Sequence, residues 1–111
     1  MEYINILVTE PQKVPYIIRI KNELEPIQQI IGSQALNFLE YNNQIIITAL
    51  REQQRTPNIK IDNNVIYGTF VICSADKDGD FVSVTKKNQK KLCKIIIAKQ
   101  QNLKEAISLM E

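Results

Sequence analysis

The sequence predicts an α+β domain, in which a mostly antiparallel sheet packs two or three helices on one face. Short segments rich in isoleucine and valine recur between Asn, Asp and Gly residues, a pattern typical of strands joined by tight turns. Two other segments carry apolar residues at helical spacing. The chain has 111 residues, which fits one domain. We expect that domain to span residues 1–99, with residues 100–111 as a C-terminal helical extension.

The first predicted element is a hairpin near the N-terminus. Residues 3–9 (YINILVT) alternate between polar and apolar side chains and are rich in β-branched residues, which favours a strand. Residues 10–15 contain two prolines and form a connection, and residues 16–20 (YIIRI) form a second strand. We expect the two strands to pair antiparallel.

A helix is predicted next. Asn22 is a good N-cap residue, Glu25 follows three residues later as in a capping box, and Pro26 still falls in the first turn, where its missing N–H is tolerated. Gly32 is placed to end the helix in a left-handed conformation. The apolar stripe of this helix consists of Leu24, Ile27, Ile30 and Ile31.

The middle of the chain predicts further hairpins. Residues 35–41 and 44–50 flank Asn42 and Asn43, a pair that tolerates positive φ at a tight turn. The polar residues 51–58, which include a proline, indicate a loop. Strand-like residues then flank another turn signal at 62–64, and the later strand, 65–75, contains an isolated glycine, Gly68. Gly68 indicates a bulge or a close backbone approach.

The C-terminal part of the chain predicts two helices. Thr85 is the expected N-cap of the first, whose apolar side contains Leu92, Ile95 and Ile96. Residues 101–111 are expected to form a short terminal helix. Its apolar face would consist of Leu103, Ala106, Ile107 and Met110.

The composition excludes several kinds of chemistry. The chain contains no histidine, which removes His-based acid–base catalysis, Ser-His-Asp and Cys-His nucleophile pairs, and His-ligated zinc. Cys73 and Cys93 lie in apolar surroundings and cannot complete a structural zinc site by themselves. We therefore expect neither an enzyme nor a metal or other cofactor. The lack of an apolar run or a signal-peptide pattern predicts a cytoplasmic protein that does not enter the membrane.

The motif DKDGD, from Asp76 to Asp80, suggests calcium binding at first sight. Counted from Asp76, however, the glycine is fourth instead of sixth, and the twelfth residue is Lys87 instead of glutamate. The flanking segments are strand-like, whereas a calcium loop of this kind joins helices. We predict the tip of a hairpin, with Asp78 and Gly79 at the turn.

Charge is distributed unevenly along the chain. Residues 86–111 contain seven lysines against two glutamates, a balance of +5, whereas the preceding residues have a balance of −3. Lys87 and Lys91 are therefore candidates for binding phosphates of a nucleic acid. The alternative is a lysine-bearing helix face that is simply solvated, because arginine and interleaved aromatic residues are absent from this segment.

A second group of candidate binding residues lies in or beside the predicted strands. Arg51 and Arg55 could grip an anionic ligand or an acidic partner surface, with Tyr16 and Asn58 as further binding residues. The alternative is ordinary surface chemistry at strand edges. Residues of the same kind nearby are Arg19, Tyr67 and Thr69.

The order of short motifs resembles that of a small uncharacterised family, the domain-of-unknown-function family 3846, found on phages, plasmids and integrative elements of Gram-positive bacteria. The matching residues in this sequence are Glu10-Pro11, Pro15-Tyr16, Leu24, Ile27, Gln28, Pro57-Asn58, Gly68 to Phe70, the Asp-Gly hairpin, and Ser83 to Thr85. The resemblance covers about residues 4–99, while residues 45–55 and the tail beyond Lys99 depart from it. It implies no catalytic residues, and it implies an accessory role in a mobile element.

These observations lead to three functional hypotheses. The first is a non-enzymatic accessory protein that binds a host protein, as anti-CRISPR or anti-restriction proteins do. The second is a protein that sequesters a nucleotide or another small anionic ligand, as a homodimer or larger oligomer with the site between subunits. The third is nucleic-acid binding through the lysine-rich helix.

Overall fold

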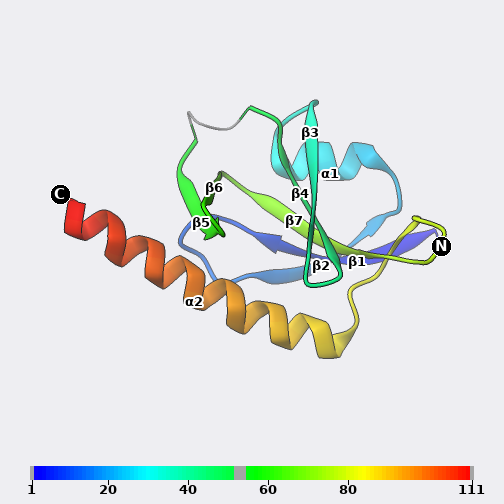
Figure 1. The fold of residues 1–111 in the computed structure, drawn as a ribbon. Helices are drawn as coiled ribbons and strands as arrows, with labels where there is room; N and C mark the ends of the chain where they lie inside the picture. The colour runs from blue at the N-terminus through cyan, green and yellow to red at the C-terminus, as the bar shows by residue number, and fades with distance from the viewer. Residues whose placement is uncertain (1, 52–54, 111) are drawn as a thin grey trace.

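A six-stranded antiparallel sheet forms the centre of the protein in the computed structural model, which describes residues 2–51 and 55–110 (Figure 1). Its strands are β1 (Tyr3–Thr9), β2 (Tyr16–Lys21), β3 (Leu36–Tyr41), β4 (Gln44–Ala49), β7 (Phe70–Ala75) and β8 (Phe81–Val82). They are arranged in the order β2-β1-β7-β4-β3, and β8 pairs with β7. A separate hairpin consists of β5 (Pro57–Ile61) and β6 (Asn64–Tyr67), and the helices are α1 (Leu24–Ile31) and α2 (Lys86–Met110). The predicted α+β class is confirmed.

The two helices cover opposite faces of the sheet (Figure 1). On what we call the α1 face, Ile4 and Ile6 of β1 pack with Ile27 of α1. On the α2 face, Leu7 of β1 packs with Leu92 and Ile96 of α2, together with Ile59 and Ile66 of the β5–β6 hairpin. The prediction that all helices lie on one face is therefore wrong in this respect. Consecutive side chains of a strand point to opposite faces, and the central strands are apolar on both.

The central strands carry apolar side chains on both faces of the sheet, so both faces must be shielded from water. Ile46 and Ile47 follow one another in β4, as Val71 and Ile72 do in β7, and one member of each pair lies in each core. Uninterrupted apolar runs of this kind are typical of strands that are buried on both sides.

The predicted turns are confirmed. Asn42 and Asn43 have φ of 50° and 63° between β3 and β4, and Asp62 has φ of 54° between β5 and β6. In the DKDGD motif, Gly79 has φ of 85°, and one carboxylate oxygen of Asp76 accepts hydrogen bonds from the backbone N–H groups of Asp78 (2.9 Å) and Asp80 (3.0 Å). Within residues 2–51 and 55–110, no cluster of acidic or cysteine side chains is arranged to hold a metal ion.

The start of α1 differs from the prediction. The N-cap position is Glu23, which makes no side-chain capping bond, instead of Asn22. The backbone N–H of Asn22 donates to the Glu2 carbonyl (2.8 Å), which extends the β1–β2 pairing, and its side-chain amide donates to the Phe81 carbonyl (3.0 Å). Asn22 is therefore held by the sheet instead of the helix. Gly32 ends the helix with φ of 76°, as predicted.

Helix α2 is continuous over 25 residues, so the prediction of two separate C-terminal helices is wrong. No proline or glycine occurs after Gly79, and nothing interrupts the helical hydrogen bonding between the two predicted segments. The N-cap is confirmed: Thr85 Oγ1 accepts a hydrogen bond from the backbone N–H of Asn88 (3.3 Å). Residues 100–110 of the predicted extension are the last turns of α2.

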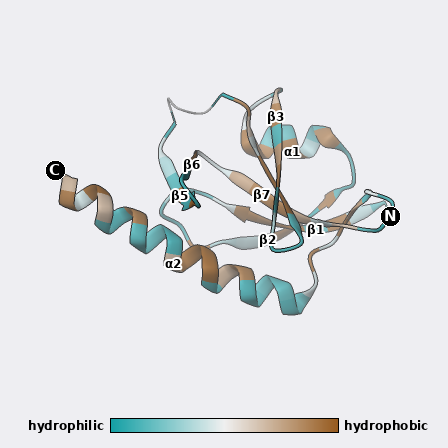
Figure 2. Cartoon of the chain, in the orientation of Figure 1, coloured by the Kyte–Doolittle hydropathy of each residue, from teal (hydrophilic) through white to brown (hydrophobic). Residues whose placement is uncertain are grey.

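The length of α2 exceeds that of the sheet layer beneath it. At 1.5 Å per residue the helix measures about 37 Å, and the molecule measures 46 × 30 × 21 Å. Figure 1 shows the last turns of α2 running past the β5–β6 hairpin. The hydropathy of its turns alternates along the axis: the first turns are polar, and apolar turns follow where the helix lies against the sheet (Figure 2). Neither helix in the described ranges has the length and apolar content to cross a membrane.

Candidate functional site

Arg55, a predicted binding residue, is occupied by contacts within the fold. Its guanidinium Nη1 donates to the carbonyl of Ile31 (2.6 Å) and its Nη2 to the carbonyl of Gly32 (2.7 Å), at the C-terminal end of α1. A cation at the C-terminal end of a helix also interacts favourably with the helix dipole. The same side chain lies against Gly68, where an added Cβ would come within 2.7 Å of Arg55 Cδ. Arg55 therefore ties α1 to the β5–β6 segment instead of facing a ligand.

Gly68 fulfils the predicted close backbone approach, and it also divides the predicted strand 65–75. With φ of 74°, it separates β6 from β7. Its backbone N–H donates to the Thr56 carbonyl (2.7 Å). The chain thus leaves the β5–β6 hairpin and enters the central sheet at this residue. The apolar run 65–75 therefore contributes one strand to each of the two sheets.

Asn58, another predicted binding residue, is a buried structural residue with an exposed fraction of 3%. Its side-chain nitrogen Nδ2 donates to the carbonyls of Thr9 (3.0 Å) and Gly68 (2.8 Å). Its oxygen Oδ1 accepts from Nε2 of Gln100 in α2 (3.1 Å), and that nitrogen also donates to the Glu10 carbonyl (3.2 Å). This network fastens α2 to the loop after β1 and leaves the side chain of Asn58 no free surface for a ligand.

The remaining predicted residues do not form one site. Tyr16 pairs with Val8 and therefore projects on the α1 face, where burial, and then the hydrogen bond and negative charge of Glu10, raise the pKa of its hydroxyl. Lys87 and Lys91 are exposed on α2, and Arg51 is exposed just after β4. The six residues are thus divided between the two faces and the interior, and they provide no common pocket for an anionic ligand.

The two cysteines are separated by the sheet. Cys73 belongs to the core of the α1 face, whereas Cys93 packs against the core of the α2 face, and both are free thiols. Burial raises the pKa of Cys73 to about 12 and also raises the pKa of Cys93. A thiol that is neutral and buried is a poor nucleophile and a poor metal ligand. Cys73 is therefore a core residue.

We expect the buried thiol of Cys73 to make the protein less stable at alkaline pH. Its folded-state pKa, about 12, lies above the ordinary cysteine pKa of 9.0, so its contribution to stability is complete below pH 9 and is lost as the pH rises toward 12. Between pH 9 and pH 12, ionisation of Cys73 in the unfolded chain should lower the free energy of unfolding by about 1.4 kcal/mol per pH unit. Urea unfolding of the wild type and of Cys73→Ala at several pH values measures it. Equal pH dependence in the two proteins contradicts the prediction.

The outer surface of α2 carries the largest excess of charge. The helix contains seven lysines and one glutamate, Glu105. Among the described residues, the ion pairs join Lys13 to Glu10 (3.8 Å) and Lys21 to Glu23 (3.4 Å), and none includes a lysine of α2. Its exposed lysines are Lys86, Lys87, Lys90, Lys91, Lys94 and Lys104. Their charge is thus available to an acidic partner.

A groove between this helix and the β1–β2 loop adds apolar surface to the lysines. Its volume is about 170 Å³, and its lining includes Val14 and Ile97, which are 70% and 44% exposed. Lys13 and Lys104 stand in the same lining, which is completed by Gln12, Gln100 and Gln101. We call this feature the Val14–Ile97 groove. It could bind an apolar side chain while its lysines pair with acidic neighbours.

The prediction from sequence missed the Val14–Ile97 groove, although part of the signal is present. Ile95, Ile96 and Ile97 are consecutive in α2. Successive helical residues point about 100° apart, so three neighbours cannot all face one core. One of them had to be exposed, and the structure shows that it is Ile97. Its proximity to Val14 depends on how α2 docks, which the sequence does not reveal.

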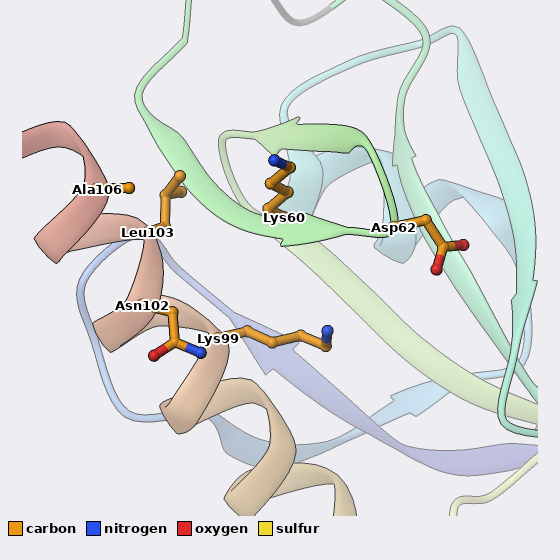
Figure 3. A pocket seen from close by; sticks show the side chains of 6 residues that line it. All are labelled: Lys60, Asp62, Lys99, Asn102, Leu103 and Ala106. Carbon is orange, nitrogen blue, oxygen red and sulfur yellow. The ribbon is translucent and has the colours of Figure 1, made fainter. Parts of the chain in front are cut away.

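A second groove lies between the β5–β6 hairpin and the C-terminal half of α2. It has a volume of about 390 Å³ and is lined by Lys60, Asp62, Lys99, Asn102, Leu103 and Ala106 (Figure 3). The side chains of Lys60 and Lys99 extend in different directions in Figure 3, and their ammonium groups do not converge on one position. That of Lys99 lies over the ring of Tyr41, 5.9 Å from its centroid. This groove adds positive charge to the surface without defining an anion site.

The protein is a small α+β domain. Its antiparallel sheet is buried on both faces, and the basic helix α2 covers one of them. The chain belongs to the family described as Domain of unknown function (DUF3846), whose model matches residues 4–97. No curated protein and no solved structure matches the chain. The family match ends at Ile97, so the last part of α2 lies outside it.

Proposed function

We propose that this protein is a non-enzymatic accessory protein of a phage or another mobile element, which binds a host protein and acts in counter-defence. The supporting observation is the Val14–Ile97 groove, whose lining combines these two exposed apolar side chains with Lys13 and Lys104. The motif order of the sequence, which resembles that of mobile-element proteins, motivates the biological setting. The partner surface that fits is acidic, with an apolar side chain at its centre.

The combination of apolar and basic groups favours a protein as the partner. Protein interfaces concentrate their binding energy in a few apolar or aromatic anchors, surrounded by polar groups that exclude water. Val14 and Ile97 supply the apolar centre, and the lysines of α2 supply a rim that steers an acidic surface toward it. Nucleic-acid binding needs no apolar centre of this kind.

Nucleic-acid binding remains a second candidate, because the lysines of α2 lack ion-pair partners among the described residues. A row of lysines on a helix can contact successive phosphates. Against this candidate, α2 contains neither arginine, the residue that best reads base edges, nor an aromatic residue on which bases could stack.

Capture from lysates of candidate bacterial hosts tests the proposal with three forms of the protein. We expect the wild type to retain a specific protein that Ile97→Asp fails to retain. The matched control is Leu24→Asp, which places the same charge on an exposed apolar residue of α1, on the opposite face, and should retain the partner. Equal melting temperatures establish that all three are folded. Equal capture by Ile97→Asp and the wild type contradicts the proposal.

The same experiment separates the second candidate from the first. Nuclease treatment of the lysate should not affect capture by a protein contact. If the retained material is nucleic acid, its affinity should fall steeply with salt and should disappear in the double variant Lys87→Glu/Lys91→Glu. That result would replace the protein partner with a nucleic acid.

A further inference from the structure

Strand β3 ends the sheet and exposes an edge with little charge. Among the described residues it has a strand neighbour, β4, on one side alone. Its sequence, LNFLEY, contains one charged residue, Glu40, and its exposed side chains include Phe38 (46%) and Leu39 (38%). The opposite edge strand, β2, carries Arg19 and Lys21. Charged side chains commonly protect an edge strand from pairing with another chain, so β3 is the less protected edge.

The pairing with β4 determines which backbone groups of β3 point outward. Leu50 N–H donates to the Ala35 carbonyl (3.0 Å), next to the pair Leu36 and Ala49. Hydrogen-bonded and non-hydrogen-bonded pairs alternate along an antiparallel ladder. Asn37 and Leu39 therefore bond to β4. The N–H and C=O groups that point away from β4 belong to Leu36, Phe38 and Glu40.

We propose that two copies of this protein associate through β3, with a two-fold axis at Phe38, to form one continuous sheet. In this register Phe38 pairs with Phe38 of the second copy and Leu36 pairs with Glu40, so the outward backbone groups of all three residues are satisfied. A two-fold arrangement also closes the assembly, because each molecule uses its β3 edge once.

Charge and strand length select this register among the symmetric ones. An axis at Glu40 would place two carboxylates directly opposite each other, which is unfavourable. An axis at Asn37 or at Leu39 would pair an outward residue with Gln34 or with the turn residue Asn42, outside the strand. With the axis at Phe38, Glu40 of one molecule lies opposite Leu36 of the other, and no like charges lie opposite each other.

The side chains on the α1 face favour a second copy as the occupant. Phe38 projects on the α1 face, and its ring lies 6.0 Å from that of Phe81, which packs against the α1-face core. The two-fold axis brings two such pairs together, so that the apolar core of one molecule continues into that of the other. An extended peptide from another protein could satisfy the backbone groups but would have to supply its own apolar side chain opposite Phe38.

Sedimentation equilibrium over a range of concentrations tests the proposal. We expect the wild type to reach twice the mass of the chain, and Phe38→Lys and Phe38→Glu each to remain monomeric, because like charges meet at the axis. An equimolar mixture of the two variants should associate again, a rescue that a folding defect cannot produce. Arg19→Glu, on the β2 edge, is the control and should dimerise like the wild type.

Amide hydrogen exchange locates the interface independently. The amides of Leu36, Phe38 and Glu40 should exchange slowly in concentrated solution and quickly in dilute solution, whereas those of Asn37 and Leu39, bonded to β4, should be slow in both. A wild type that stays monomeric at every soluble concentration overturns the proposal. So does a dimer that persists in Phe38→Lys, or a monomer whose β3 amides are protected only when a foreign peptide binds.

Discussion

Replacing Ile96 by aspartate should lower the free energy of unfolding by about 4 kcal/mol or more. The side chain is 2% exposed and packs in the α2-face core, which also contains Leu92. The variant loses a buried apolar side chain and must bury an unpaired carboxylate or release the helix from the sheet. Total stabilities of small domains are about 5–15 kcal/mol, so a large fraction of the molecules could unfold. Urea unfolding followed by circular dichroism measures the change.

The neighbouring residue of the same helix provides the control. Ile97→Asp introduces the same side chain one position later, where Ile97 is exposed in the Val14–Ile97 groove. Its free energy of unfolding should stay within about 0.5 kcal/mol of that of the wild type. Equal destabilisation by both substitutions would show that α2 packs on the sheet with a different rotation about its own axis. Ile97 would then not line the Val14–Ile97 groove as described.

Replacing Asn58 by alanine should cost about 3 kcal/mol, although the sequence suggested a binding residue. The substitution removes three hydrogen bonds, each worth about 1 kcal/mol net. It also leaves the carbonyls of Thr9 and Gly68 and the amide of Gln100 without this partner in a buried place. A lower melting temperature in thermal unfolding checks the prediction.

A side-chain amide on the exposed surface is the matched control for Asn58. Nε2 of Gln101 donates to the carboxylate of Glu105 (3.1 Å) one turn further along α2, in contact with water. Gln101→Ala should change the free energy of unfolding by no more than about 0.5 kcal/mol. If Asn58→Ala were as stable as this control, the buried network would be of little importance, and a binding role for Asn58 would have to be reconsidered.

The predicted secondary structure was most accurate where the signal is local. The Asn42-Asn43 turn, the cap at Thr85 and the left-handed Gly32 depend on the conformation of one or two residues, and all three are confirmed. Asn22 was misassigned because its backbone is held by Glu2 and its side chain by Phe81, both distant in sequence. A capping pattern cannot include such competing partners.

The candidate site was predicted less well than the fold. The exposed lysines of α2 were found, because a run of lysines cannot be buried without partners. Arg55 and Asn58 were taken for binding residues, yet their hydrogen bonds to carbonyls of other segments use these side chains within the fold. The polarity of a residue does not distinguish a side chain that binds a ligand from one that joins segments of the fold, as Arg55 does before β5 and Asn58 does within it.

The sequence by itself determined the α+β class, the hairpins, the exposed lysines and the lack of histidine chemistry, since these follow from composition and short-range periodicity. Tertiary structure alone decided that the helices cover opposite faces, that Val14 meets Ile97, and that β3 lies at the edge of the sheet. The physical reason is that strand order and helix docking depend on contacts between residues far apart in the chain. A local pattern specifies which side of an element is apolar, but not which other element covers it.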